Sequence, residues 1–239
     1  MTATTETTVG DIVASDFRAA AVFHKFGIDF CCGGGATLSD ACRKQNVSPG
    51  DVLQALTTAC ETPAGATPRF NTWDVQTLVS YIVSNHHAYV RETLPTLQAH
   101  ARKLASVHGE NHPELIEVTA LVDAVYDEMT SHMMKEERVL FPFINALGAA
   151  AQQGTPAPVP PFGRVSNPIR MMEQEHESAG AALARIRQLT GGYVPPADGC
   201  TTYRITMKEL EAFENDLHAH VHLENNILFP KALELEARG

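Results

Sequence analysis

The sequence predicts an all-α protein with a small amino-terminal helical domain followed by a four-helix bundle. From residue 71 onward, apolar residues recur at alternating steps of three and four, which is the spacing of one buried helical face. Four such patterns follow one another, and four apolar stripes can bury each other as a bundle. The residues before them form short helical segments, each with its own start signal.

We expect three parts along the chain: a helical domain at residues 1–62, a linker at 63–70 and the bundle at 71–239. The segment ETPAGATPRFN between the two domains is rich in Pro, Gly and Thr, which interrupt helices and are typical of connections. A chain of 239 residues can bury one full-sized core and a smaller one, so two domains fit its length.

The amino-terminal domain is predicted to contain helices with the sequences DIVASDFRAAAVFHKFG, TLSDACRKQ and SPGDVLQALTTAC. Gly27 is expected to end the first helix. Thr37, three residues before Asp40, is expected to cap the second helix through its hydroxyl group. Ser48, three residues before Asp51, is expected to cap the third helix in the same way.

The segment GIDFCCGGGAT between the first two helices is predicted to be a tight loop, because three consecutive glycines permit backbone angles that are closed to other residues. The loop presents the adjacent thiols of Cys31 and Cys32. These are either small packing residues, or accessible and redox-active thiols that could also join two chains in a disulfide. We expect Cys42, Cys60 and Cys200 to be structural.

Each predicted helix of the bundle carries one stripe of residues that should face the core. In chain order the four stripes are Val83, His87, Val90, Leu94, Leu97, Ala101 and Leu104; Leu115, Val118, Val122, Val125, Met129, His132, Glu136, Val139, Phe143 and Leu147; Ile169, Met172, His176, Ala179, Leu183 and Ile186; and Leu210, Phe213, Leu217, His220, Glu224, Ile227 and Lys231. Pro95 lies inside the first of these helices and predicts a kink or a break there.

Polar side chains interrupt the stripes where Leu or Val would otherwise close the core. Burying such groups costs several kcal/mol unless they are paired or bind a metal ion. His132 and Glu136 lie four residues apart, as do His220 and Glu224. Residues at this spacing share a helix face, so each pair can offer an imidazole and a carboxylate to one metal site.

An internal repeat strengthens this interpretation. The segments HMMKEERVLFP and HVHLENNILFP share the pattern HxxxExxxLFP. His87 lies 45 residues before His132, and His176 lies 44 residues before His220, so the second half of the bundle resembles a copy of the first. A single core histidine is more often structural than a metal ligand, but four histidines and two glutamates at matching spacings make metal binding the better explanation. We therefore predict two metal ions held by His87, His132, Glu136, His176, His220 and Glu224.

Imidazole and carboxylate ligands without thiolate suit iron, manganese or zinc, and a carboxylate-bridged pair in a bundle core favours iron. The predicted cofactor is thus two iron ions joined by an oxide bridge, with a position left for a further ligand. Glu128, one turn before His132, and Glu175, directly before His176, either orient ligand imidazoles or relay protons from outside the ligand shell, or belong to solvated helix faces. We expect His86, His218 and His222 to lie on the surface.

Composition excludes several classes of function. The net charge of −10 would repel a nucleic-acid backbone. No apolar stretch is long enough to cross a bilayer, and the amino terminus lacks the features of a secretory signal. Five cysteines, two of them adjacent, are a poor disulfide framework and favour a reducing, cytoplasmic location.

The cysteine-pair segment DFCCGGGATLSDAC and the repeated HxxxExxxLFP pattern together resemble the iron-sulfur cluster repair di-iron proteins, also called the repair-of-iron-centres family. The resemblance covers nearly the whole chain. It implies a haemerythrin-like bundle whose ligand positions fall on the six residues named above, and it places Cys31 and Cys32 at the family's paired positions. The Pro-rich connection between residues 148 and 168 departs from the family pattern.

The resemblance implies repair of iron-sulfur clusters damaged by nitrosative or oxidative stress, with iron supplied from a labile di-iron site. Damaged iron-sulfur proteins would be the partners, and the cysteine pair could contact a damaged cluster. Two alternatives remain open: an enzyme that reduces nitric oxide, and a haemerythrin-like protein that binds nitric oxide or dioxygen. Neither a nucleic-acid nor a membrane partner is expected, and a homodimer is possible.

Overall fold

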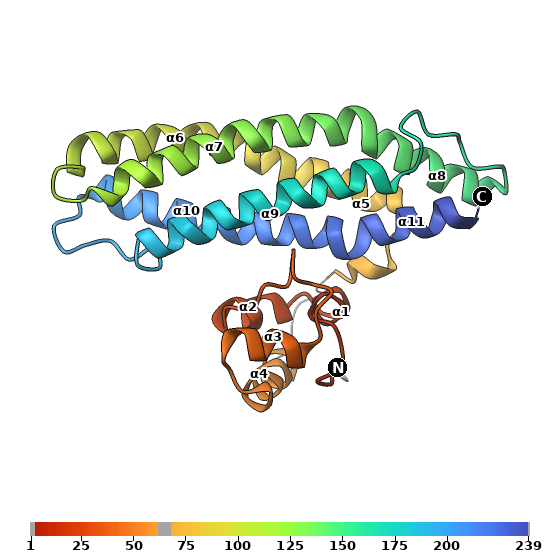
Figure 1. The fold of residues 1–239 in the computed structure, drawn as a ribbon, viewed down its shortest axis with the longest axis horizontal. Helices are drawn as coiled ribbons and strands as arrows, with labels where there is room; N and C mark the ends of the chain where they lie inside the picture. Colours follow the sequence, from red (N-terminus) through yellow and green to blue (C-terminus); the bar gives the residue numbers. More distant parts are fainter. Residues whose placement is uncertain (1–2, 62–67, 239) are drawn as a thin grey trace. The chain divides into compact units, whose positions relative to one another are not determined.

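A computed structural model describes residues 3–61 and 68–238 of the chain, and its described residues are predominantly helical (Figure 1). The expected linker therefore falls partly outside the described residues. The elements are, in order, α1 Val9–Ser15, α2 Ala19–Lys25, α3 Leu38–Gln45, α4 Pro49–Glu61, η1 Phe70–Thr72, α5 Val75–Tyr81, η2 Ile82–His87, α6 Ala88–His108, α7 Glu114–Lys135, η3 Glu136–Leu140, α8 Phe141–Gln153, α9 Ser166–Leu189, α10 Thr201–Leu223, η4 Glu224–Leu228 and α11 Phe229–Arg238. This confirms the all-α class.

The chain divides into two compact units. The first unit comprises Met1–Ser80, Phe143–Ser166 and His218–Gly239, and the second comprises Tyr81–Pro142 and Asn167–Leu217. In the part of the chain that the structure describes, no helix is both long and apolar enough to span a membrane.

Several predicted helix ends of the amino-terminal segment are confirmed. The hydroxyl groups of Thr37 and Ser48 accept hydrogen bonds from the backbone of Asp40 and Asp51, at 3.1 Å and 3.4 Å. Gly27 follows α2 with a φ of 68°, in the left-handed region that favours glycine. The glycine-rich loop differs from expectation, because residues 33–35 do not adopt positive φ angles.

The predicted single helix at residues 11–27 is wrong, because the chain forms two helices there. α1 ends at Ser15, and Asp16 is extended with a φ of −153°. The Asp16 carboxylate accepts a hydrogen bond of 3.1 Å from the backbone N–H of Arg18. A short acidic side chain that binds the backbone two residues later competes with helical hydrogen bonding, which explains the interruption.

The second unit is built from two helical hairpins. Helix α6 lies beside α7, and α9 lies beside the part of α10 that ends at Leu217 (Figure 1). The apolar residues of the predicted stripes in these helices are buried: Val90, Leu94, Leu97, Ala101, Leu104, Leu115, Val118, Val122, Val125, Met129, Ile169, Met172, Ala179, Leu183, Ile186, Leu210, Phe213 and Leu217. Helix α6 continues through Pro95, so no break occurs at this proline.

Three stripe positions differ from the prediction. Val83 is half-buried, because the π-helical turn η2 widens the helix and brings Ile82 onto the buried face instead. Lys231 is half-buried and donates hydrogen bonds of 2.9 Å to the carbonyl groups of Asn71 and Trp73. Val139 is 47% exposed, although Ile227 at the matching position of the second repeat is buried.

π-Helical turns also begin at Glu136 and at Glu224, in the two copies of the repeat. In each, the backbone N–H of the phenylalanine in LFP donates to the carbonyl of the glutamate five residues earlier. The proline that follows has no N–H and clashes with the carbonyl of the residue four before it in a regular helix. A wider turn relieves that clash, so the LFP sequence explains why both copies contain the same irregularity.

Arg187 and Glu214 join α9 to α10 by a bidentate ion pair, with N–O distances of 2.5 Å and 2.9 Å. Glu214 is completely buried. We predict that Arg187→Met lowers the free energy of unfolding by about 3 kcal/mol, because it leaves a buried carboxylate without its charge partner. Urea denaturation followed by circular dichroism measures this change.

Arg185→Met provides the matched control, since Arg185 and Glu117 form a similar pair whose side chains are 43% and 49% exposed. Its effect should stay within about 1 kcal/mol. Equal losses in the two variants would show that burial does not determine the contribution of the Arg187 pair.

Candidate metal centre

The second unit contributes four of the predicted ligands. His87 ends η2, His132 lies in the last turn of α7, Glu136 begins η3, and His176 lies in the middle of α9. All four side chains are buried. Each continues the apolar stripe of its helix, so the packing that closes the core also carries these polar groups inward.

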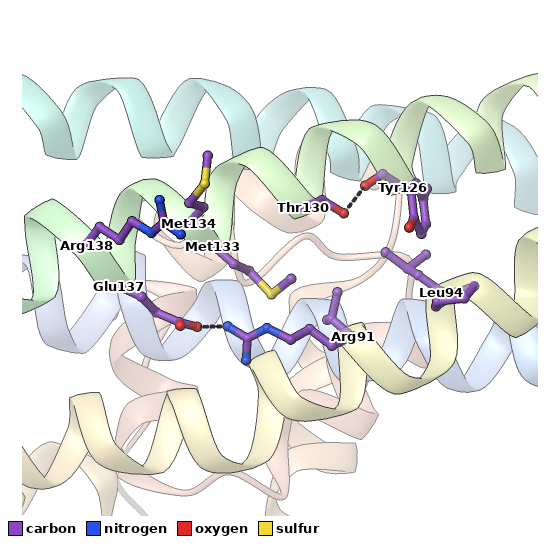
Figure 2. A pocket seen from close by; sticks show the side chains of 10 residues that line it. Arg91, Leu94, Tyr126, Thr130, Met133, Met134, Glu137 and Arg138 are labelled. Atoms are coloured by element: carbon purple, nitrogen blue, oxygen red, sulfur yellow. Dashed lines mark hydrogen bonds and ion pairs between the residues drawn. The ribbon is translucent and has the colours of Figure 1, made fainter.

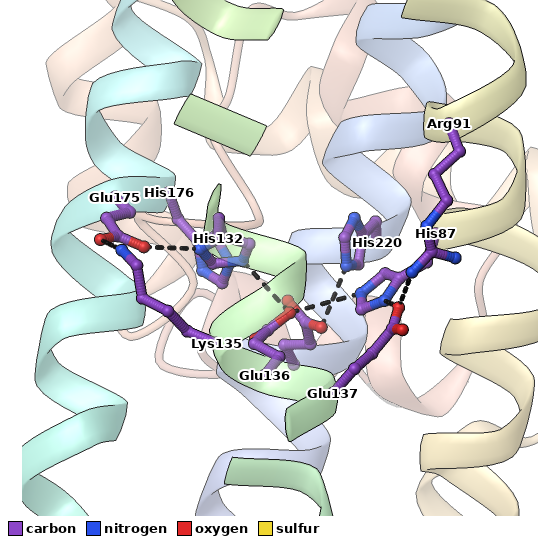
Figure 3. A network of polar contacts seen from close by, with 10 residues as sticks. His87, Arg91, His132, Lys135, Glu136, Glu137, Glu175, His176 and His220 are labelled. Carbon is purple, nitrogen blue, oxygen red and sulfur yellow. Dashed lines mark hydrogen bonds and ion pairs between the residues drawn. The ribbon is translucent and has the colours of Figure 1, made fainter. Parts of the chain in front are cut away.

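Their ligand atoms converge within this unit (Figure 3). Nε2 of His132 lies 3.0 Å from Nε2 of His176. One carboxylate oxygen of Glu136, Oε2, lies 3.3 Å from Nε2 of His132 and 3.3 Å from Nε2 of His87. A single carboxylate thus faces two imidazoles, as a bridging ligand would.

The outer hydrogen bonds determine which ring nitrogen faces inward as an acceptor. Nδ1 of His87 lies 2.6 Å from Glu137, and Nδ1 of His132 lies 2.9 Å from Glu175. Because an ionised carboxylate can only accept, each Nδ1 carries the proton, and a neutral ring then presents the lone pair of Nε2. Lone pairs directed at the Glu136 carboxylate repel it unless a cation lies between them.

The distances also fit shared coordination. Two ligand atoms that are each about 2.1 Å from one ion lie about 3.0 Å apart in octahedral geometry and about 3.4 Å apart in tetrahedral geometry. The separations of 3.0 Å and 3.3 Å fall in this range. Imidazole nitrogen and carboxylate oxygen suit iron, manganese or zinc, so the residues present fit a metal ion.

The first unit contributes the other two predicted ligands. His220 lies near the end of α10, and Glu224 begins η4. Both are completely buried, and Nε2 of His220 lies 3.0 Å from Oε1 of Glu224. This pair repeats the arrangement of His132 and Glu136, including the π-helical turn that starts at the glutamate.

The outer carboxylates are themselves bound to cations. Glu175 also pairs with Lys135, and Glu137 also pairs with Arg91 (Figure 3). The hydrogen bond from His132, followed by that from Lys135, lowers the pKa of Glu175 to about 2. Burial acts to raise the pKa of Glu137, but hydrogen bonds from His87 and Arg91 outweigh it, so the pKa is lowered. Both groups are therefore ionised at neutral pH.

The chain is similar to known proteins over nearly its whole length. Residues 5–60 match the family described as a domain of unknown function (DUF542), and residues 78–232 match the hemerythrin HHE cation binding domain. The iron-sulfur cluster repair protein YtfE of Musicola paradisiaca (strain Ech703) is 35% identical over 97% of this chain and 98% of that protein. The protein of the same name from Yersinia pestis (strain Pestoides F) is 37% identical over 92% of this chain and 93% of its own. The chain belongs to the family of iron-sulfur cluster repair proteins.

In this member of the repair family, Glu175 contacts a predicted ligand as the sequence suggested. Oε2 of Glu128 instead accepts a hydrogen bond of 3.1 Å from Ser178. Sequence reasoning missed Glu137, which contacts His87. Its position directly after Glu136 is a weak signal, because adjacent residues of a regular helix point in different directions.

Two predictions about surface histidines are wrong. His86 is only 7% exposed, and its Nδ1 lies 3.0 Å from Asp216. The widened turn η2 explains this, because it rotates the helix phase that the sequence argument assumed to be regular. His222 is completely buried, and burial lowers its pKa to about 4, so the ring is neutral at pH 7.

The cysteine pair occupies a loop that Asp29 organises. The Asp29 carboxylate accepts hydrogen bonds of 3.0 Å from the backbone N–H groups of Cys31, Cys32 and Gly33. The thiol of Cys31 lies 3.2 Å from the same carboxylate and 4.0 Å from the Cys32 sulfur. The hydrogen bond with Cys32 and burial raise the pKa of Cys31. Cys31 is therefore a protected, protonated thiol, whereas Cys32 is partly exposed.

We predict that Glu175→Gln and Glu137→Gln each weaken iron binding by about 10- to 100-fold, because each removes a charge that increases the basicity of a ligand imidazole. Competition with a chelator measures the affinity. Glu128→Gln is the control and should leave the affinity unchanged. A loss in Glu128→Gln as large as in the other variants would show that Glu128 also supports the ligands.

Cys200 is exposed, contrary to the expected structural role, and its sulfur lies 3.2 Å from Nε2 of His108. The backbone N–H of Tyr203, then the hydrogen bond from His108, lower the pKa of Cys200 to about 7. We predict that the alkylation rate of Cys200 by iodoacetamide rises with pH through a midpoint near this value, because the thiolate reacts. Peptide mass spectrometry follows the reaction, and His108→Gln should raise the midpoint. An unchanged midpoint in that variant would remove His108 as a cause.

Proposed function

We propose that this protein repairs iron-sulfur clusters damaged by nitrosative or oxidative stress, and that it does so by supplying iron from a labile pair of iron ions. One observation carries this proposal. A chain similar over nearly its full length to iron-sulfur cluster repair proteins buries an imidazole and carboxylate set suited to iron.

We further propose how six residues share two ions. Each ion would take two of the four histidines, while Glu136 and Glu224 would contribute to both. Support comes from the internal repeat, because each copy of HxxxExxxLFP supplies one histidine and one glutamate at the same spacing. The observed position of Glu136 between His87 and His132 agrees with a bridging role.

The charges of these residues favour a centre that can release its metal. Glu136 and Glu224 supply two negative charges against the four positive charges of two ferrous ions. The outer carboxylates add little, because Lys135 and Arg91 accompany them. Two positive charges would then be left without compensation by this chain's own residues, which would weaken their hold on the metal.

Bound iron would supply the atoms needed to rebuild a damaged cluster, and this chain's residues would control their release. Neutral imidazoles bind the metal only while deprotonated at Nε2, which Glu137 and Glu175 favour by holding the Nδ1 protons. Damaged iron-sulfur proteins would be the partners, and the cytoplasm would be the site of action. Nitric oxide or dioxygen as a small ligand, and a homodimer, stay predictions.

We predict that the full-length protein, loaded with iron and reduced anaerobically, restores activity to an iron-sulfur enzyme whose cluster has been nitrosylated. His132→Leu should abolish the effect, because it removes one buried ligand. His100→Leu is the matched control, since His100 pairs with Glu209 and is not a predicted ligand. Recovery of enzyme activity and transfer of labelled iron are measured together.

The alternatives give different results in the same samples. Catalytic formation of nitrous oxide without iron transfer would favour a nitric oxide reductase. Reversible dioxygen binding with full retention of iron would favour a carrier or sensor. Either result, with no recovery of the damaged enzyme, would overturn the repair proposal.

A further inference from the structure

The two copies of HxxxExxxLFP differ in burial at several matching positions, among them three at which the first copy is exposed. His222 and Ile227 of the second copy are buried and Asn226 is half-buried, whereas the matching Met134, Arg138 and Val139 of the first copy are exposed. Within the first unit, α1 packs against η4, which covers the second copy. Among the described residues, α1 therefore packs against the turn of the second copy, whereas the matching Met134, Arg138 and Val139 of the first copy stay exposed.

Asn226 makes the polar contacts of this interface. Its side-chain amide donates hydrogen bonds of 3.2 Å and 3.0 Å to the backbone carbonyl groups of Phe30 and Cys31. Nδ1 of His222 lies 3.2 Å from the same nitrogen, while the rings of Phe17 and Phe30 lie beside the His222 ring. One amide thus binds the loop that carries the cysteine pair.

Two glycines make room for this amide. A Cβ atom added at Gly34 or at Gly10 would overlap the side-chain oxygen of Asn226. Gly34 belongs to the three-glycine run, whose members do not adopt positive φ angles. The close approach of Asn226, rather than an unusual backbone conformation, is thus the physical reason for glycine at this position.

The cysteine loop is consequently held from two sides. Asp29 binds the N–H groups of Cys31 and Cys32, and Asn226 binds the carbonyl group of Cys31. Cys31 is only 5% exposed in this arrangement. Asn226 itself lies two residues after Glu224, in the same π-helical turn.

We propose that Asn226 is a positioning residue that fixes the Cys31–Cys32 loop against the helix turn beginning at Glu224 and keeps the Cys31 thiol protected. The amide provides donors where two loop carbonyl groups need them, and the absence of side chains at Gly34 and Gly10 admits it. The turn η4 therefore contains the predicted ligand Glu224 and also Asn226, which contacts the loop of the thiol pair.

The metal-free, full-length protein tests this proposal, so the result does not depend on iron. The alkylation rates of Cys31 and Cys42 by iodoacetamide are measured by peptide mass spectrometry. In Asn226→Ala the rate at Cys31 should rise by about tenfold, which corresponds to about 1.4 kcal/mol of lost hydrogen bonding. Cys42, which is completely buried, should stay protected and so report that the amino-terminal helices remain folded.

Asn226→Asp separates hydrogen bonding from packing, because it keeps the shape but places a carboxylate oxygen against two carbonyl groups. It should expose Cys31 at least as much as the alanine variant. Arg138→Ala is the matched control at the equivalent position of the first copy, where Arg138 and Met134 line an open pocket of about 340 Å³ (Figure 2). This control should leave both cysteines unchanged.

Gly34→Ala tests the contact from the other side. Alone it should expose Cys31, because the new methyl group overlaps Asn226. Combined with Asn226→Ala it should add almost nothing, since the overlapping atom is gone. Additive effects, unchanged Cys31 reactivity in Asn226→Asp, or a joint rise at Cys31 and Cys42 would each overturn the positioning role.

Discussion

Burial of ionisable groups is the constraint on which the rest of this structure depends. His87, His132 and Glu136 are removed from water in the second unit, where an uncompensated carboxylate would cost several kcal/mol. The surrounding residues reduce that cost in layers. Carboxylates hold the outer nitrogens of two imidazoles, and surface cations hold those carboxylates in turn. A cation between the inner nitrogens and Glu136 would complete the compensation.

Local backbone geometry also helps to place the proposed ligands in the core. The LFP sequence forces a widened turn directly after each buried glutamate, so the irregularity lies beside the proposed ligands and leaves the long hairpins regular. The helical segments η2, α7 and α9 supply rigid positions for the imidazoles of His87, His132 and His176, which a loop could not. Asn226, which binds the cysteine loop, lies in the widened turn of the second copy.

The sequence predicted the all-α fold and the burial of the proposed ligands because these follow from helical period alone. His132 and Glu136 stand where Leu would stand, and a strict spacing of three and four places them inside. Prediction from the sequence failed where the helical period changes, or where another segment of the chain covers a helix face. His86 was misplaced because η2 is π-helical, and His222 was misplaced because Phe17 and Phe30, from segments between the amino-terminal helices, lie beside its ring. Asp16 interrupted a helix through a side-chain hydrogen bond that no period reveals.

The two halves of the bundle match at the proposed ligands but differ in the residues that support those ligands. Glu137 and Glu175 support His87 and His132, both from the first half of the bundle. The matching residues for the second half are Asn225 and His86, which are not carboxylates. Asn225 and Asn226 of the second copy are neutral, and Asn226 binds uncharged carbonyl groups of the cysteine loop. The matching residues of the first copy, Glu137 and Arg138, are charged, and Glu137 pairs with His87 and Arg91.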